Sequence, residues 1–242
     1  MEREILRIEN LYFNYSDAPV LRDVNFTLHK GDFLGVIGAN GAGKSTLLKL
    51  ILGLLPPDKG EIYVHGESVK KTRPQIGYVS QKANSFNIDF PATVKEVVMS
   101  GIRKRMFSAY NRADRDKLDD VLKKVGIFEY RDKLIGRLSG GQQQRAFIAR
   151  ALIADNDIII LDEPTVGIDA VSVRGIMELI SEINSRGITI IMTNHDTPSL
   201  TAAANKLLVF CEHGNGELLD KASLTDAELD EIYAGRRGHH HA

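Results

Sequence analysis

The sequence has almost no cysteine, because Cys211 is the single one among 242 residues. One thiol cannot form a disulfide within the chain, and it cannot supply a zinc site that needs several thiolates. We therefore expect a protein of a reducing compartment such as the cytosol.

Neither sign of charge is in excess, because 31 Lys and Arg face 32 Asp and Glu, for a formal net charge of -1. This balance disfavours nucleic acid as a partner of the whole surface. No apolar run approaches the roughly 18 residues of a membrane-spanning helix, and the first residues lack the pattern of a secretory signal. We expect any membrane role to come through a partner. With 43% hydrophobic residues, the composition is that of a globular protein, and we expect one large domain over residues 1–242.

The first part of the chain alternates between predicted strands and one predicted helix. Strands are expected at Ile5–Ile8, around Leu21–Leu28, at Phe33–Ile37, at Glu61–Val64 and at Ile76–Val79. The helix is expected at Lys44–Leu54, ended by Pro56 and Pro57. Phe33–Ile37 is an uninterrupted apolar run, which is typical of a parallel strand buried on both faces.

The middle of the chain has helical periodicity, and we predict a helical subdomain over residues 83–137. Thr93 and Glu96 fit a capping box, as do Ser139 with Gln142 and Thr225 with Glu228. After Ser139 the chain alternates again, with these expected elements: a helix to Ala154, the strand Ile158–Leu161, a helix at Ala170–Ile183, and strands at Ile188–Met192, Lys206–Phe210 and Gly216–Asp220. The pattern predicts a doubly wound α/β fold around a parallel sheet.

A phosphate-binding loop lies between the buried strand Phe33–Ile37 and the following helix. Residues 38–46 fit G-x-x-x-x-G-K-[ST], in which glycines turn backbone amides toward the phosphates of a nucleotide. Lys44 is expected to reach the β- and γ-phosphates and Ser45 to ligate Mg²⁺. The expected nucleotide-binding residues of this loop are Gly38, Asn40, Gly41, Ala42, Gly43, Lys44, Ser45 and Thr46.

Two adjacent carboxylates end the buried strand Ile158–Leu161. An acidic pair at a strand end is by itself more often a solvated turn, but the phosphate loop in the same chain favours a catalytic role. We expect Asp162 to hold Mg²⁺ through water and Glu163 to polarise the water that attacks the γ-phosphate.

The pentapeptide Leu138–Gln142 resembles the signature of ATP-binding cassette (ABC) ATPases. The resemblance extends over almost the whole chain, and it implies a P-loop core with an N-terminal antiparallel β subdomain and an inserted helical subdomain. It also implies Mg²⁺-dependent ATP hydrolysis.

Four further positions match the family in their proper order. The resemblance implies that Tyr15 stacks on adenine, that Gln81 contacts Mg²⁺ and the attacking water, that Asp169 lies at a dimer seam, and that His195 lies near the γ-phosphate. Each position also has a structural interpretation: a core or edge-strand tyrosine, a strand-capping glutamine, a helix N-cap and a structural histidine, respectively.

The family assembles as a head-to-tail dimer, which would pair Ser139, Gly141 and Gln142 of one subunit with the ATP bound by Lys44 of a second copy. One position departs from the usual pattern, because Val166–Asp169 replaces the more common Ser-x-Leu-Asp type. The seam geometry is therefore less well defined by the resemblance than the phosphate loop is.

Two other classes of ABC ATPase are disfavoured. Chromosome-type ATPases place a long coiled coil between the phosphate loop and the signature, and this chain has no sustained heptads there. Tandem translation factors need two cassettes, and this sequence contains one. A transporter subunit fits better, although a scaffold or cofactor-assembly ATPase, or a subunit for another substrate, stays open. The segment after Gln81, Lys82–Val98, resembles bacterial zinc and manganese importers.

That resemblance implies membrane permease subunits as partners, an extracellular metal-binding protein acting indirectly, and a place on the cytoplasmic face of the membrane. In this group Phe90 and Pro91 lead into the part that receives the permease, and Ser85–Asn87 favour zinc. We expect the basic run Arg103–Arg105, together with Arg112 and Arg115, to form a solvated face or to lie near anionic lipids. His239–His241 fit a mobile or added tail better than a metal site.

Overall fold

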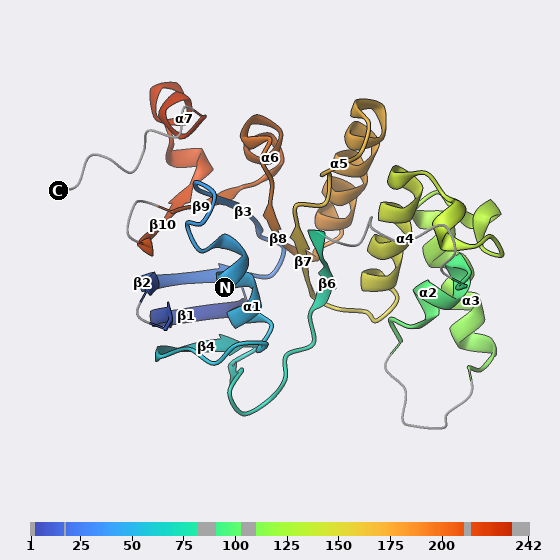
Figure 1. Cartoon of the computed structure of the whole chain (residues 1–242), viewed down its shortest axis with the longest axis horizontal. Coiled ribbons are helices and arrows are strands. Elements are labelled where there is room, and N and C mark those ends of the chain that lie inside the picture. Colours follow the sequence, from blue (N-terminus) through green and yellow to red (C-terminus); the bar gives the residue numbers. More distant parts are fainter. Residues whose placement is uncertain (1–2, 17, 82–90, 103–109, 211–213, 234–242) are drawn as a thin grey trace. The chain divides into compact units, whose positions relative to one another are not determined.

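The structure is a computed structural model that describes residues 3–16, 18–81, 91–102, 110–210 and 214–233 (Figure 1). The chain divides into two units, one of Met1–Gln75 with Asn184–Ala242 and the other of Ile76–Ile183. Within the described ranges, no helix combines the length and the apolar character needed to cross a bilayer.

The first unit contains an antiparallel sheet of strands β1 (Glu4–Tyr15), β2 (Ala18–His29), β4 (Lys59–Val64) and β5 (Glu67–Ser68), in the order β2-β1-β4-β5. It confirms the antiparallel N-terminal part. Strand β1 runs well past the predicted Ile5–Ile8 because a bulge, with Asn10 at φ +46°, breaks the strict alternation on which that prediction depended.

The same unit contains a second group of strands centred on β3 (Phe33–Ile37). Strand β3 pairs in parallel with β8 (Thr189–Thr193) on one side and β9 (Lys206–Phe210) on the other, and β10 (Gly216–Asp220) pairs antiparallel with β9. Every residue of β3 and β8 is buried, as expected for parallel strands covered on both faces. The predicted parallel core is confirmed, with one antiparallel edge strand.

Three helices accompany these strands: α1 (Lys44–Ile51), α6 (Thr197–Ala203) and α7 (Asp226–Tyr233), with a short 3₁₀ turn at Lys221–Ser223. Helix α6 packs closely on β3, because a Cβ added at Gly35 would lie 3.0 Å from Leu200 Cγ.

Helix α1 ends at Ile51, three residues before the predicted Leu54, and the prolines are not the cause. Gly53 adopts φ +66°, and the amide of Leu54 donates to the carbonyl of Lys49 at 2.9 Å. This is the Schellman arrangement, in which a left-handed glycine closes the last turn.

The second unit pairs two parallel strands, β6 (Gly77–Val79) and β7 (Ile158–Asp162), and carries most of the helices. These are α2 (Val94–Met99), α3 (Arg112–Lys124), α4 (Gly140–Leu152) and α5 (Ala170–Ser185), with 3₁₀ turns at Phe128–Tyr130 and Ile135–Arg137. Helices α2, α3 and α4 gather in one cluster (Figure 1).

Close contacts and capping boxes fix this helical cluster. A Cβ added at Gly101 would lie 2.1 Å from the carbonyl oxygen of Arg150, so only glycine allows the chain after α2 to approach α4 this closely. The capping boxes predicted at Thr93 and Ser139 are confirmed, as is the one at Thr225 in the first unit. The subdomain bounds 83–137 stay a prediction, and Ser85–Phe90, Arg103–Arg105, Cys211 and His239–His241 lie outside the described residues.

Candidate active site

The glycine-rich loop between β3 and α1 is tightly packed at its ends and open in its middle. Gly43 adopts φ +97°, and a Cβ there would lie 2.8 Å from Leu21 Cδ2. A Cβ at Gly38 would lie 2.8 Å from Phe210 Cβ, whereas one at Gly41 would meet nothing within 4 Å. The loop is therefore fixed to its own unit and leaves room above Gly41 for a ligand.

Helix α1 begins at Lys44, directly behind the glycine loop. Its N-cap, Gly43, makes no side-chain hydrogen bond, and its first turn holds no acidic residue. Helices α2 and α3 by contrast each carry an acidic residue in the first turn, Glu96 and Asp114. A helix N-terminus without such a carboxylate, placed behind a glycine loop, suits a phosphate group.

The ammonium of Lys44 is already directed over this loop. Its Nζ donates to the carbonyl oxygens of Gly38 at 2.7 Å and Ala39 at 2.9 Å, and the residue is only 9% exposed. Ser45, in the first turn of α1, is exposed. The loop therefore places one buried cation and one exposed hydroxyl at the start of the helix.

Two further predicted residues belong to the same unit. His195 follows β8 and is exposed, and because β8 pairs in parallel with β3, it lies at the sheet edge from which the glycine loop also leaves. Tyr15 ends β1, is 46% exposed, and meets the ring of Phe13 edge-on with centroids 4.9 Å apart. A tyrosine with this exposure is accessible to a ligand, which a core tyrosine would not be.

In the second unit, β6 and β7 bring Gln81 to the carboxylates. Asp162 is 7% exposed and Glu163 is 9% exposed. The side-chain amide of Gln81 donates to Oε2 of Glu163 at 2.5 Å. The structure therefore brings Gln81 against the expected general base, and the amide orients that carboxylate.

The backbone at Glu163 is strained, since φ is +50° at a residue with a long side chain. Such a conformation costs roughly 1–3 kcal/mol and persists where surrounding structure enforces it, typically at functional sites.

Tyr78 on β6 is a member of this group that the sequence analysis missed. Burial raises the pKa of Tyr78 to about 12, assisted by the negative charge of Asp162 and by a hydrogen bond to that carboxylate. The phenol is therefore protonated at neutral pH and acts as the donor. Tyr78 could be placed beside Asp162 only from the pairing register of β6 with β7, which no local sequence pattern indicates.

The signature residues lie at the N-terminus of α4, packed against the loop that carries Asp169. Ser139 caps the helix, and a Cβ at Gly141 would lie 2.7 Å from Ser172 Oγ. The amide of Ser172 donates to Oδ1 of Asp169 at 3.0 Å, so Asp169 is the N-cap of α5, and hydrogen bonds from Ser172 lower its pKa. Gln142 completes the capping box with Ser139.

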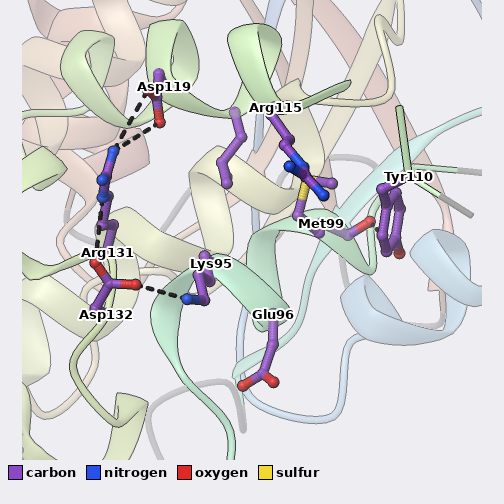
Figure 2. A pocket seen from close by; sticks show the side chains of 9 residues that line it. Lys95, Glu96, Met99, Tyr110, Arg115, Asp119, Arg131 and Asp132 are labelled. Carbon is purple, nitrogen blue, oxygen red and sulfur yellow. Dashed lines mark hydrogen bonds and ion pairs between the residues drawn. The ribbon is translucent and has the colours of Figure 1, made fainter. Parts of the chain in front are cut away.

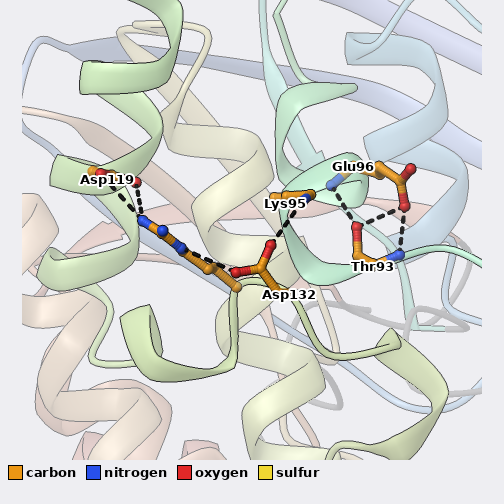
Figure 3. Close-up of polar contacts among 6 residues, drawn as sticks. Thr93, Lys95, Glu96, Asp119 and Asp132 are labelled. Carbon is orange, nitrogen blue, oxygen red and sulfur yellow. Dashed lines mark hydrogen bonds and ion pairs between the residues drawn. The ribbon is translucent and has the colours of Figure 1, made fainter.

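A separate cavity of about 660 Å³ lies among the helices of the second unit (Figure 2). Met99, Tyr110 and Leu118 supply apolar surface. Charged side chains border it in a chain of ion pairs: Asp119 to Arg131, Arg131 to Asp132 at 3.2 Å, and Asp132 to Lys95 at 2.6 Å (Figure 3). Lys95 and then Arg131 lower the pKa of Asp132, and the Thr93 cap lowers that of Glu96.

Comparisons with known proteins agree with this geometry. The family model described as "ABC transporter" matches residues 21–166. The zinc uptake system ATP-binding protein ZurA of Listeria innocua is 44% identical over 85% of this chain and 82% of its own length. The manganese transport system ATP-binding protein MntB of Bacillus subtilis is 42% identical over 79% and 77%, respectively.

A solved structure shares the fold over nearly its full length. CbiO1 of Clostridium perfringens, described as part of the ABC transporter complex cbiONQ, aligns with a TM-score of 0.81 and 30% identity over 98% of both chains. The family model alone matches well over half of the sequence. The chain therefore belongs to the ABC transporter family, as one of its ATP-hydrolysing subunits.

Proposed function

We propose that this protein powers the import of a divalent metal ion, zinc or manganese, through separate membrane permease subunits. The ATPase assignment is carried by one observation: a glycine loop ahead of an uncapped helix start, with Lys44 held over it. The choice of metal is supported by the two relatives named for zinc and manganese transport.

ATP binding is assigned to the residues of the first unit. The amides of the glycine loop and of the first turn of α1 receive the phosphates, and the Lys44 ammonium exchanges its carbonyl partners for phosphate oxygens. The exposed ring of Tyr15 stacks on the adenine. His195 donates to the γ-phosphate.

Hydrolysis is assigned to Glu163, with Gln81 positioning its carboxylate. Glu163 accepts a proton from the attacking water, and the hydrogen bond from Gln81 holds one of its oxygens while the other faces the reaction. Because Gln81 belongs to the segment that leads into the helices, movement there would change the orientation of the base.

Mg²⁺ fits the chemistry of the donors that the chain provides. Ser45, Gln81 and Asp162 offer hydroxyl, amide and carboxylate oxygens, which are the hard ligands that Mg²⁺ prefers. When bound with ATP, the ion neutralises charge on the phosphate oxygens. We assign Asp162 the task of holding its hydration shell.

A second copy of the chain is the proposed partner across the nucleotide. The N-terminus of α4, with Ser139 as cap and no acidic residue in its first turn, is a second helix start suited to an anion. Since the glycine loop already supplies a phosphate site in the same chain, we assign the α4 terminus to the nucleotide of a second copy. Beside it, Val166 is 39% exposed and Val171 is 82% exposed. Exposed valines flanking Asp169 suit an interface, so we infer a head-to-tail dimer that closes on ATP.

The cavity among α2, α3 and the following turn is the proposed dock for the permease. Its lining combines apolar with charged side chains, as protein interfaces do, and it lies in the unit that contains Glu163 (Figure 2). Docking there places the protein on the cytoplasmic face of the membrane.

The metal-import role predicts growth failure without this protein in metal-depleted medium. Deletion of its gene should abolish growth in chelated medium, and added zinc or manganese should restore it, since uptake then no longer depends on ATP-driven transport. The measurement is growth with each metal added separately, which also identifies the metal. Normal growth of the deletion strain under starvation for both metals would contradict metal import.

The dock predicts a variant that separates ATP hydrolysis from transport. Tyr110→Ala combined with Arg115→Glu should lower metal uptake by at least about tenfold while the purified chain keeps its ATPase rate, because both residues line the cavity and are exposed. The matched control is Arg112→Glu on the same helix, whose side chain is 94% exposed and does not line the cavity. Equal uptake in the two variants would place the dock elsewhere.

A further inference from the structure

The strand β6 and the residues after it supply a donor to each of the two carboxylates at the end of β7. Gln81 donates to Glu163. Tyr78 donates to Asp162. The two acids that the proposed mechanism uses for different tasks are therefore each held by a different side chain of one short segment.

The register of the parallel pair explains this arrangement. Tyr78 lies opposite Ile160, and Val79 lies opposite Leu161. Side chains alternate between the two faces of a sheet, so Tyr78, Ile160 and Asp162 share one face. Asp162 is two residues beyond the partner of Tyr78, which is a diagonal separation that a long aromatic side chain spans.

We propose that Tyr78 is a positioning residue for Mg²⁺, because its hydroxyl fixes the orientation of the Asp162 carboxylate that holds the ion's hydration shell. This inference rests on the proposed role of Asp162. A carboxylate with one oxygen already engaged has fewer rotamers to lose when the hydrated ion binds, and groups that orient metal-holding residues typically contribute 10- to 100-fold to metal affinity.

The competing interpretation is that Tyr78, which is only partly exposed, serves to pack β6 against neighbouring side chains. A phenylalanine would fill the same volume and lack only the hydroxyl. The variant Tyr78→Phe therefore separates the two roles, because a packing residue tolerates this change and a hydrogen-bond donor does not.

The test measures how much nucleotide affinity the chain gains from Mg²⁺. A fluorescent, non-hydrolysable ATP analogue is titrated into the full chain in EDTA and again in saturating Mg²⁺. The dissociation constant in EDTA divided by that in Mg²⁺ gives the gain in affinity, and this ratio is compared between variants. We expect Tyr78→Phe to lower this ratio about tenfold, with the affinity in EDTA unchanged. The Mg²⁺ concentration for half-maximal ATPase activity should rise in parallel.

Two further variants make the result decisive. Tyr63→Phe changes a strand tyrosine of the first unit, which lies under the Arg7 guanidinium at 4.4 Å, and it should leave the ratio unchanged. Asp162→Asn tests the proposed function itself. If Asp162→Asn lowers the ratio and Tyr78→Phe does not, the role of Tyr78 is wrong. If neither lowers it, the assignment of Asp162 to Mg²⁺ is wrong as well.

Discussion

Glu163→Gln should bind ATP and fail to hydrolyse it. The substitution keeps the size and polarity of the side chain and removes the general base, a contribution of about 100- to 10,000-fold in rate. Glutamine can still pair with Gln81, which donates to Glu163 at 2.5 Å in the structure, so the local arrangement should survive. Steady-state ATPase assays and binding of a fluorescent ATP analogue measure the two effects separately.

The same variant should accumulate as a dimer, because ATP that is not hydrolysed keeps the two copies together. Size-exclusion chromatography with and without ATP measures this. Adding Val171→Asp should dissolve the dimer, since a carboxylate replaces an apolar side chain that is 82% exposed beside Asp169. Leu54→Asp is the control, because Leu54 is also exposed, at 51%, and lies just beyond the end of α1, remote in sequence from Asp169. A Glu163→Gln chain that stays monomeric at saturating ATP would argue against the head-to-tail dimer.

Local signals in the sequence predicted much of the fold, and they failed where long-range structure decided the outcome. Phe33–Ile37 was correctly predicted as a strand, because a short apolar run followed by a phosphate-binding glycine loop is typical of a buried strand rather than a helix. Helix α6 was not anticipated, since its seven residues are mostly small or polar and show no apolar period. A further capping box, Asn111 with Asp114, starts α3 and was missed in the same way.

The candidate site shows the same division. The phosphate loop and the acidic pair were recognisable because their chemistry requires fixed residue types at short spacing. The hydrogen bond of Gln81 to Glu163 and that of Tyr78 to Asp162 join positions more than 80 residues apart. Such pairs depend on strand register, and no local pattern encodes it.

Lys44→Ala should reduce ATP hydrolysis by about 100- to 1,000-fold, the usual effect of removing a group that faces developing charge in the transition state. In the structure the ammonium donates to Gly38 and Ala39, so the alanine variant loses two hydrogen bonds that hold the loop as well as the contact with phosphate. Part of the loss should therefore appear as weaker nucleotide binding.

Two controls separate the charge from the shape of the loop. Lys49→Ala removes a lysine from the exposed side of the same helix and should leave both ATP affinity and turnover unchanged. Lys44→Met keeps the unbranched shape and most of the length of the side chain without its charge. If the methionine variant is as inactive as the alanine variant while its thermal midpoint matches the unaltered protein, the ammonium itself is required, because packing has been preserved. Undiminished turnover in either variant would contradict a phosphate role for this loop.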